Sequence, residues 1–86
     1  MTDTARVRIV LADDHPVFRL GLRAVLDGAA DLTVVAEADR GDDALARIRE
    51  TQPDVAVLDL EMPGLDGIAV ALALQQARLP VKTVLL

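Results

Sequence analysis

Short apolar runs alternate with longer stretches of mixed character along this chain, and the alternation predicts its elements. Apolar runs rich in β-branched residues predict four strands, at residues 7–12, 32–36, 54–58 and 81–86. Apolar residues at helical spacing between these runs predict three helices, at residues 15–28, 42–51 and 67–77. Strands that alternate with helices predict an α/β fold with a parallel sheet and right-handed crossovers.

The first and third predicted helices differ in how clearly the sequence marks a buried face. The first helix carries its apolar side chains at helical spacing, at positions Val17, Phe18, Leu22, Val25 and Leu26. The third helix follows Asp66, a residue type suited to an N-cap, and is apolar on nearly every side. We therefore expect the third helix to be well buried.

Composition narrows the class of protein. Hydrophobic residues make up 52% and charged residues 27% of the chain, which is typical of a globular domain rather than a disordered one. The chain has no cysteine, so disulfides and thiolate metal sites are excluded. The net charge is −5 and the arginines are scattered singly, so we expect no direct binding of nucleic acid by these residues. No apolar run approaches the roughly 18 residues that span a bilayer, so we expect no membrane contact and a cytoplasmic location.

Acidic residues follow two of the predicted strands at the point where each strand ends. Asp13 and Asp14 come directly after the first strand, and Asp59 comes directly after the third. In a doubly wound sheet of order 2-1-3-4-5 these two strands are neighbours, and ligands bind beyond their carboxyl ends. Two such charges about 6 Å apart repel by roughly 3 kcal/mol at an effective dielectric of 20. The three carboxylates therefore indicate a divalent cation site, for which oxygen ligands favour Mg²⁺, with Mn²⁺ as a possible substitute.

A carboxylate beside such a cation suggests phosphoryl transfer, because the carboxylate can attack phosphorus while the cation neutralises the phosphoryl oxygens. Asp59 is the candidate nucleophile because it stands alone at its strand end. The Asp13-Asp14 pair is better suited to holding metal. The following Met62-Pro63-Gly64 segment would turn the backbone sharply and could aim the carbonyl of Glu61 at the cation.

These residues resemble the receiver domain of two-component response regulators. Three segments carry the resemblance: LADDHPVFRLGLRAVL (11–26), VAVLDLEMPGLDG (55–67) and, more weakly, VVAEADRGDDALARI (34–48). The resemblance covers essentially the whole chain and implies a flavodoxin-like, doubly wound parallel sheet of order 2-1-3-4-5. The DDHP motif followed by an Arg-x-Gly helix is similar to the NarL/LuxR-type regulators, which usually carry a C-terminal helix-turn-helix DNA-binding output domain.

The resemblance implies a role for each acidic residue. Asp59 would be the phosphoacceptor, Asp14 a direct Mg²⁺ ligand and Asp13 an outer ligand that acts largely through water. The backbone carbonyl of Glu61 would complete the metal site. The phosphoryl group would come from a sensor histidine kinase or from a small donor such as acetyl phosphate. The chain would then be no enzyme in the ordinary sense but a phosphoacceptor that assists its own phosphorylation and dephosphorylation.

The sequence departs from the family pattern near Leu86. Receiver domains have a Ser or Thr at the end of the fourth strand and a Lys at the end of the fifth. Thr83 lies inside the fourth predicted strand and Lys82 comes too early, so neither is a substitute. We expect residues 1–86 to be the N-terminal portion of a receiver domain, without the fourth helix, fifth strand, fifth helix and output domain. These residues alone should be phosphorylated poorly or not at all.

Two alternatives remain at this point. A degenerate receiver could act only as an interaction or dimerisation module, through a homodimer or a domain swap at the edge strand. A phosphatase of the haloacid-dehalogenase type also uses an Asp at a strand end, but that family has Asp-x-Asp followed by Thr or Val. Here Glu61 occupies the second acidic position and no Thr follows.

Three basic residues lie close to the first acidic pair in the sequence. His15 is interpreted as a helix-start residue near the site that hydrogen-bonds the loop, rather than as a catalytic residue or a phosphohistidine. Arg19 and Arg23 are interpreted as solvated residues on the surface of the first helix, with contact to a kinase or another domain as the alternative.

Overall fold

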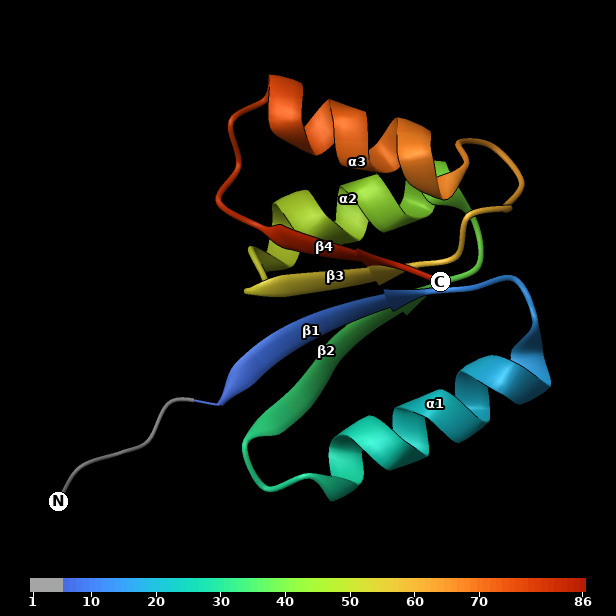
Figure 1. The fold of residues 1–86 in the computed structure, drawn as a ribbon, viewed down its shortest axis with the longest axis vertical. Helices are drawn as coiled ribbons and strands as arrows, with labels where there is room; N and C mark the ends of the chain where they lie inside the picture. Colours follow the sequence, from blue (N-terminus) through green and yellow to red (C-terminus); the bar gives the residue numbers. More distant parts are fainter. Residues whose placement is uncertain (1–5) are drawn as a thin grey trace, which may run out of the picture.

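The computed structural model describes residues 6–86 as a parallel sheet of four strands with helices on both faces (Figure 1). The sheet has the order β2-β1-β3-β4, and all three strand pairs are parallel. The strands are β1 (Val7–Ala12), β2 (Leu32–Ala38), β3 (Val55–Leu58) and β4 (Lys82–Leu85). The helices are α1 (Pro16–Gly28), α2 (Gly41–Thr51) and α3 (Gly67–Gln76). The predicted flavodoxin-like architecture is confirmed, with most element bounds within one or two residues of those expected.

The sheet buries both of its faces, which explains why β1 is apolar almost throughout its length. Val10 and Ala12 point toward α2 and α3, where they pack with Ile48 among other residues. Ile9 and Leu11 point to the opposite face, beneath α1. Figure 1 shows the same division, with α2 and α3 on one side of the sheet and α1 alone on the other.

Helix α3 is less buried than its composition predicts. Val70 and Leu74 pack in the core, whereas Ile68 and Leu72 are 53% and 52% exposed. The expectation that this helix is well buried was therefore wrong for one of its faces, because α3 contacts the sheet and α2 on one side only. A helix that is apolar all round has no periodic signal to indicate which side will be covered. In residues 6–86 no helix combines the length and the apolar character needed to cross a membrane.

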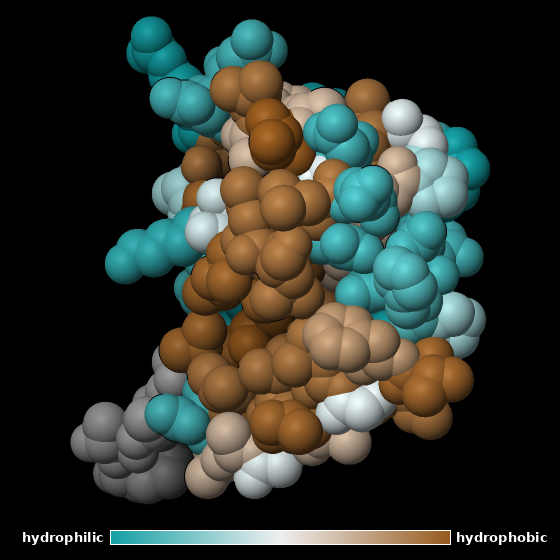
Figure 2. All heavy atoms as spheres, turned by 45° about the vertical axis from the view of Figure 1, so that its right-hand side comes forward, coloured by the Kyte–Doolittle hydropathy of each residue, from teal (hydrophilic) through white to brown (hydrophobic). Residues whose placement is uncertain are grey.

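Helix α1 also leaves apolar side chains at the surface. Leu22 and Leu26 are partly buried and pack against the core beneath α1. Val17, Phe18 and Val25 are exposed, so the helical spacing identified only part of the covered face. Figure 2 shows hydrophobic residues gathered in a broad continuous band on one side of the molecule.

Strand β2 contains an irregularity that matters for the site. Its register against β1 shifts by one residue, so Val35 has no partner in the ladder. Before the shift, Val34 packs on the α1 face, and after it, Ala38 packs on the α2 face. Regular alternation would place these two residues on the same face, and one extra residue reverses the assignment. The bulge consequently turns Glu37 toward α1.

Candidate functional site

The acidic residues after β1 and β3 lie side by side because the two strands are neighbours. The amide N–H of Asp59 donates to the carbonyl of Ala12 (2.9 Å), and that of Asp13 donates to Ala38 (3.0 Å). The sheet hydrogen bonds thus extend one residue beyond the strands. One ligand atom from each of Asp13, Asp14, His15 and Asp59 lies within 4.8 Å of the others. The three carboxylates expected to converge therefore do so.

His15 also belongs to this acidic cluster, whereas the sequence interpretation placed it near the site and not within the cluster. Its amide N–H donates to Asp13 Oδ1 (2.7 Å), as expected for a residue at the start of α1. Its ring Nδ1 lies 3.0 Å from Asp13 Oδ1, 3.1 Å from Asp14 Oδ1 and 3.5 Å from Asp59 Oδ2. The hydrogen bond to Asp13, and next the charge of Asp14, raise the pKa of His15 above its ordinary value. The only sequence signal was the position of this histidine directly after two acids.

The cluster has the chemistry of a divalent cation site. Asp13 is only 2% exposed, so its charge is poorly solvated. Carboxylate charges 4.8 Å apart repel by about 3.5 kcal/mol per pair at an effective dielectric of 20. Within residues 6–86, the buried Oδ1 of Asp14 receives no hydrogen bond, although His15 Nδ1 lies 3.1 Å from it. A free carboxylate lone pair among clustered oxygens fits a hard cation such as Mg²⁺.

The loop after β3 closes one side of the cluster. The amide nitrogen of Glu61 lies 3.4 Å from Asp59 Oδ1, so this loop turns back over the strand end. Gly64 has a φ of +78°, consistent with the sharp turn expected at Met62-Pro63-Gly64. The role of the Glu61 backbone carbonyl as a metal ligand stays a prediction.

The start of α3 packs closely against the same loop. Asp66 caps the helix as predicted, with Oδ1 accepting from the amide of Ala69 (2.8 Å). A Cβ at Gly67 would lie 2.4 Å from the carbonyl oxygen of Asp59. Glycine is therefore required at this position, because only a hydrogen atom leaves room for the helix to approach the strand end.

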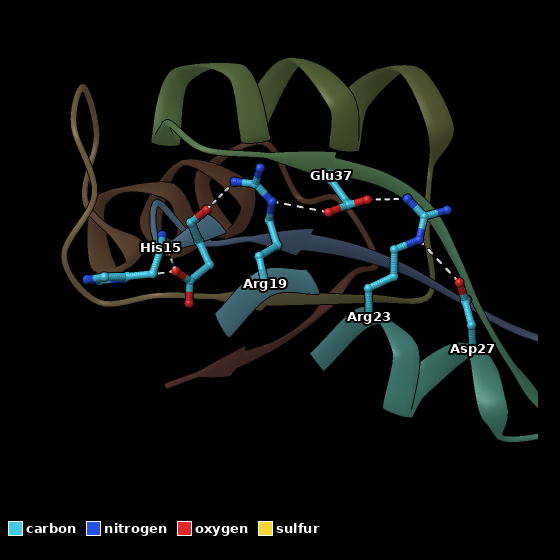
Figure 3. A network of polar contacts seen from close by, with 6 residues as sticks. His15, Arg19, Arg23, Asp27 and Glu37 are labelled. Carbon is cyan, nitrogen blue, oxygen red and sulfur yellow. Dashed lines mark hydrogen bonds and ion pairs between the residues drawn. The ribbon is translucent and has the colours of Figure 1, made fainter. Parts of the chain in front are cut away.

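Arg19 is only 22% exposed, so its interpretation as a solvated residue was wrong, whereas Arg23 is 44% exposed and lies at the surface as expected, although it also forms ion pairs. Arg19 Nε donates to Glu37 Oε1 (3.1 Å), and Arg23 Nη1 donates to Glu37 Oε2. Arg23 Nε also pairs with Asp27 one helical turn away (3.2 Å). Figure 3 shows the two guanidinium groups reaching from α1 to either side of the Glu37 carboxylate. The β2 bulge, which the sequence did not reveal, places Glu37 within their reach.

Lys82 and Thr83 lie where the sequence placed them. Both belong to β4 and both are exposed. Neither is a member of the acidic cluster.

A parallel α/β sheet with clustered acids beyond two neighbouring strands is the arrangement of response regulator receiver domains. The response regulator receiver domain family matches residues 9–86, and the chain belongs to this family. Its relatives further indicate the NarL type.

Three relatives illustrate the likeness. A transcriptional regulatory protein of Mycobacterium tuberculosis named NarL is 46% identical over 81 residues, which cover 94% of this chain and 38% of that protein. The solved signal receiver domain of a NarL response regulator from the same species has a TM-score of 0.92, with 46% identity over 94% of this chain and 65% of the solved one. A protein-glutamate methylesterase/protein-glutamine glutaminase of Myxococcus xanthus is 47% identical over 74 residues, covering 86% of this chain and 21% of its own. The chain thus spans well under half the length of these two full-length relatives.

Proposed function

We propose that this chain is the phosphoacceptor part of a NarL/LuxR-type response regulator, with Asp59 as the residue that accepts the phosphoryl group. The observation that carries the proposal is the convergence of Asp13, Asp14 and Asp59 within 4.8 Å beyond β1 and β3. Membership of the receiver domain family supports it independently. On this proposal the chain is a signalling domain of the cytoplasm and turns over no substrate of its own.

The proposed reaction is an in-line displacement at phosphorus. A carboxylate oxygen of Asp59 forms the new P–O bond as the P–N bond to the histidine of a sensor kinase breaks, and the departing imidazole takes up a proton. With acetyl phosphate as donor, the P–O bond to acetate breaks instead and acetate leaves. The product in either case is an acyl phosphate on Asp59.

The residues of the cluster would bind the cation that assists this reaction. Asp13, Asp14, Asp59 and the Glu61 carbonyl would hold Mg²⁺, with Asp13 acting largely through water. Bound Mg²⁺ would supply positive charge that offsets the carboxylates and the incoming phosphoryl oxygens. The burial of Asp13 raises the local interaction energy, since charges interact more strongly away from bulk water.

The consequence of phosphorylation is proposed to lie outside these residues. A sensor histidine kinase would supply the phosphoryl group, and a DNA-binding output domain would respond to it. The M. tuberculosis relative is a transcriptional regulatory protein, which favours that type of output. The M. xanthus relative is a methylesterase, so receivers this similar also occur in proteins of another activity.

The proposal is tested with the Asp59→Asn variant, which keeps the shape of the side chain and removes its nucleophilic charge. The natural protein, incubated with acetyl phosphate and Mg²⁺, should gain the mass of one phosphoryl group, and the variant should gain none. Asp31→Asn is the matched control, because Asp31 lies before β2 and not in the cluster. Labelling of the Asp59→Asn variant at the level of the wild type would contradict the assignment.

A second candidate function is an interaction or dimerisation module that needs no phosphorylation. It is favoured by β4, whose four residues are all exposed at the edge of the sheet in residues 6–86. An exposed edge strand presents unpaired backbone groups to a partner strand. Analytical ultracentrifugation decides between the two: a dimer that forms equally well in wild type and Asp59→Asn, without acetyl phosphate or Mg²⁺, would support this candidate.

A further inference from the structure

We propose that Arg19 is a positioning residue that holds the loop after β1 in place and thereby sets the affinity of the acidic cluster for Mg²⁺. This inference rests on the proposed function, since it takes the cluster to be a cation site. Arg19 touches none of the carboxylates expected to bind the cation; it acts on the backbone that carries them.

One guanidinium group joins three elements of the fold. Arg19 extends from α1, and its Nη1 donates to the backbone carbonyl of Asp13 (2.6 Å). Its Nε donates at the same time to Glu37 of β2 (3.1 Å). Both side chains are largely covered, at 22% exposure for Arg19 and 25% for Glu37. The rigid planar arrangement of donors in arginine suits two acceptors at fixed positions, which a lysine cannot match.

Glu37 is itself held in place, so it can serve as an anchor. Its second carboxylate oxygen accepts from Arg23, which also pairs with Asp27 (3.2 Å). The other oxygen of Asp27 accepts from the amide of Val34 (3.0 Å), one residue before the bulge in β2. A continuous series of polar contacts therefore runs from the bulge to the carbonyl of Asp13, and Figure 3 shows its central part.

The hydrogen bond from Arg19 to the Asp13 carbonyl matters because the backbone at Asp13 positions the side chains of the acidic cluster. The amide of Asp13 is fixed by the carbonyl of Ala38, and its carbonyl is fixed by Arg19. The side chain of Asp13 in turn accepts from the amide of His15. Partners that orient metal ligands in this way typically change metal affinity 10- to 100-fold when they are removed. The arrangement favours carboxylates that are already in position before a cation arrives.

If Arg19 acted only through its charge, its removal would change Mg²⁺ affinity in the opposite direction, so an experiment can distinguish the two roles. A guanidinium near a cation site repels the cation, so its removal through charge alone would tighten Mg²⁺ binding. Loss of positioning would weaken Mg²⁺ binding instead. Arg23 provides the closest control, because Arg23→Gln removes the same charge from the same helix and keeps both acceptors of Arg19. It removes one of the contacts that hold Glu37, so its effect on Mg²⁺ binding should be smaller than that of Arg19→Gln.

The experiment is a titration of the full natural protein with Mg²⁺ alone. Binding is measured by calorimetry and by NMR amide shifts, because residues 1–86 contain no tryptophan or tyrosine whose fluorescence could report on the site. We expect Arg19→Gln to raise the Kd for Mg²⁺ about tenfold and Arg23→Gln to raise it less than threefold. Thermal melts without Mg²⁺ should show comparable loss of stability for the two variants, so that a merely structural role cannot explain the difference in Kd.

The outcomes separate this inference from the function on which it rests. Mg²⁺ binding by the wild type, with a Kd that rises less than threefold in Arg19→Gln, would overturn the inference and leave the proposed function standing. If Arg19→Gln does not fold, Arg19→Lys decides by the same threefold limit, because it keeps the charge and loses the two-acceptor geometry. A wild type that does not bind Mg²⁺ would overturn both.

Discussion

Replacing Asp14 by asparagine should stabilise the cation-free protein and at the same time abolish its stabilisation by Mg²⁺. The substitution keeps the size of the side chain and removes one of three negative charges from the cluster. Asp14 is the informative choice because its buried Oδ1 accepts no hydrogen bond within residues 6–86, so its charge can be removed without breaking a hydrogen bond to that oxygen. An ordinary substitution of a buried or half-buried residue destabilises, which makes a gain in stability distinctive.

The magnitude follows from the geometry of the cluster. Asp14 lies within 4.8 Å of ligand atoms of both Asp13 and Asp59. Each pair repels by about 3.5 kcal/mol at an effective dielectric of 20 and by about 0.9 kcal/mol in bulk water. The Asp14 side chain is 32% exposed, so solvent screening brings the sum of two pairs toward the lower limit. The lost attraction to His15 Nδ1, which lies 3.1 Å from Asp14 Oδ1, offsets most of this sum, so we expect a gain of about 0.5 kcal/mol, or roughly 2 to 4 °C in Tm for a domain of this size.

The assay is thermal unfolding followed by circular dichroism, first in EDTA and then with Mg²⁺. In EDTA, Asp14→Asn should melt above the wild type. Mg²⁺ at about ten times its Kd should stabilise the wild type by roughly 1.4 kcal/mol and leave the variant unchanged. Asp31→Asn, which removes the same charge outside the cluster, should show neither effect. A variant that melts at or below the wild type in EDTA would refute the view that the three carboxylates repel one another in the folded protein.

Three further tests, which use five substitutions, examine the packing and the polar contacts of the fold. Gly67→Ala should lower the free energy of unfolding by at least about 2 kcal/mol, because a Cβ there would lie 2.4 Å from a backbone carbonyl oxygen. Gly21→Ala, where a Cβ meets open space, should raise it by about 0.5 to 1 kcal/mol. Chemical denaturation measures both changes. Leu74→Ala should cost about 2 to 5 kcal/mol in the same assay and Ile68→Ala much less, since Leu74 is buried and Ile68 is half exposed. Asp27→Asn tests the pH dependence of stability. A backbone hydrogen bond, and next the hydrogen bond from Arg23, lower the pKa of Asp27 below its ordinary value of 3.8. The charged Asp27 therefore stabilises the fold at a pH above 3.8, and this stabilisation is lost as the pH falls through the folded-state pKa. The Tm difference between wild type and Asp27→Asn should therefore be largest near pH 7 and vanish in strong acid; a difference independent of pH would contradict this.

The alternation of strands and helices could be predicted from local signals, whereas the strand order came from the resemblance to receiver domains. Given that order, one topological rule predicts the acidic cluster. Asp13, Asp14 and Asp59 each follow a run of apolar residues, and parallel strands bring their carboxyl ends to one edge. His15 was placed correctly in the chain but not in the cluster. Its ring direction depends on how α1 leaves β1, which a single histidine after two acids does not specify.

The parts that could not be predicted depend on tertiary register. Simple alternation along β2 places Glu37 on the face opposite to Val34, and only the bulge at Val35 brings it toward α1. The pairing of Arg19 and Arg23 with Glu37 follows from that shift and has no signal in the α1 sequence. The exposed side chains of α1 and α3 are a comparable case, since helical spacing shows which residues share a face and not how much of the face is covered.

The bulge therefore connects two features that the sequence presents as unrelated, a strand in the middle of the chain and an acidic loop near its start. A regular β2 would point Glu37 away from α1 and leave Arg19 without its second acceptor. The carbonyl of Asp13 would then be held by a side chain anchored at one end only. Because a cluster of like charges is pushed apart in the absence of a cation, such a loop would relax outward and bind Mg²⁺ less tightly. On this argument, the residue added to β2 contributes to the acidic site indirectly, because it places Glu37 where it can anchor Arg19.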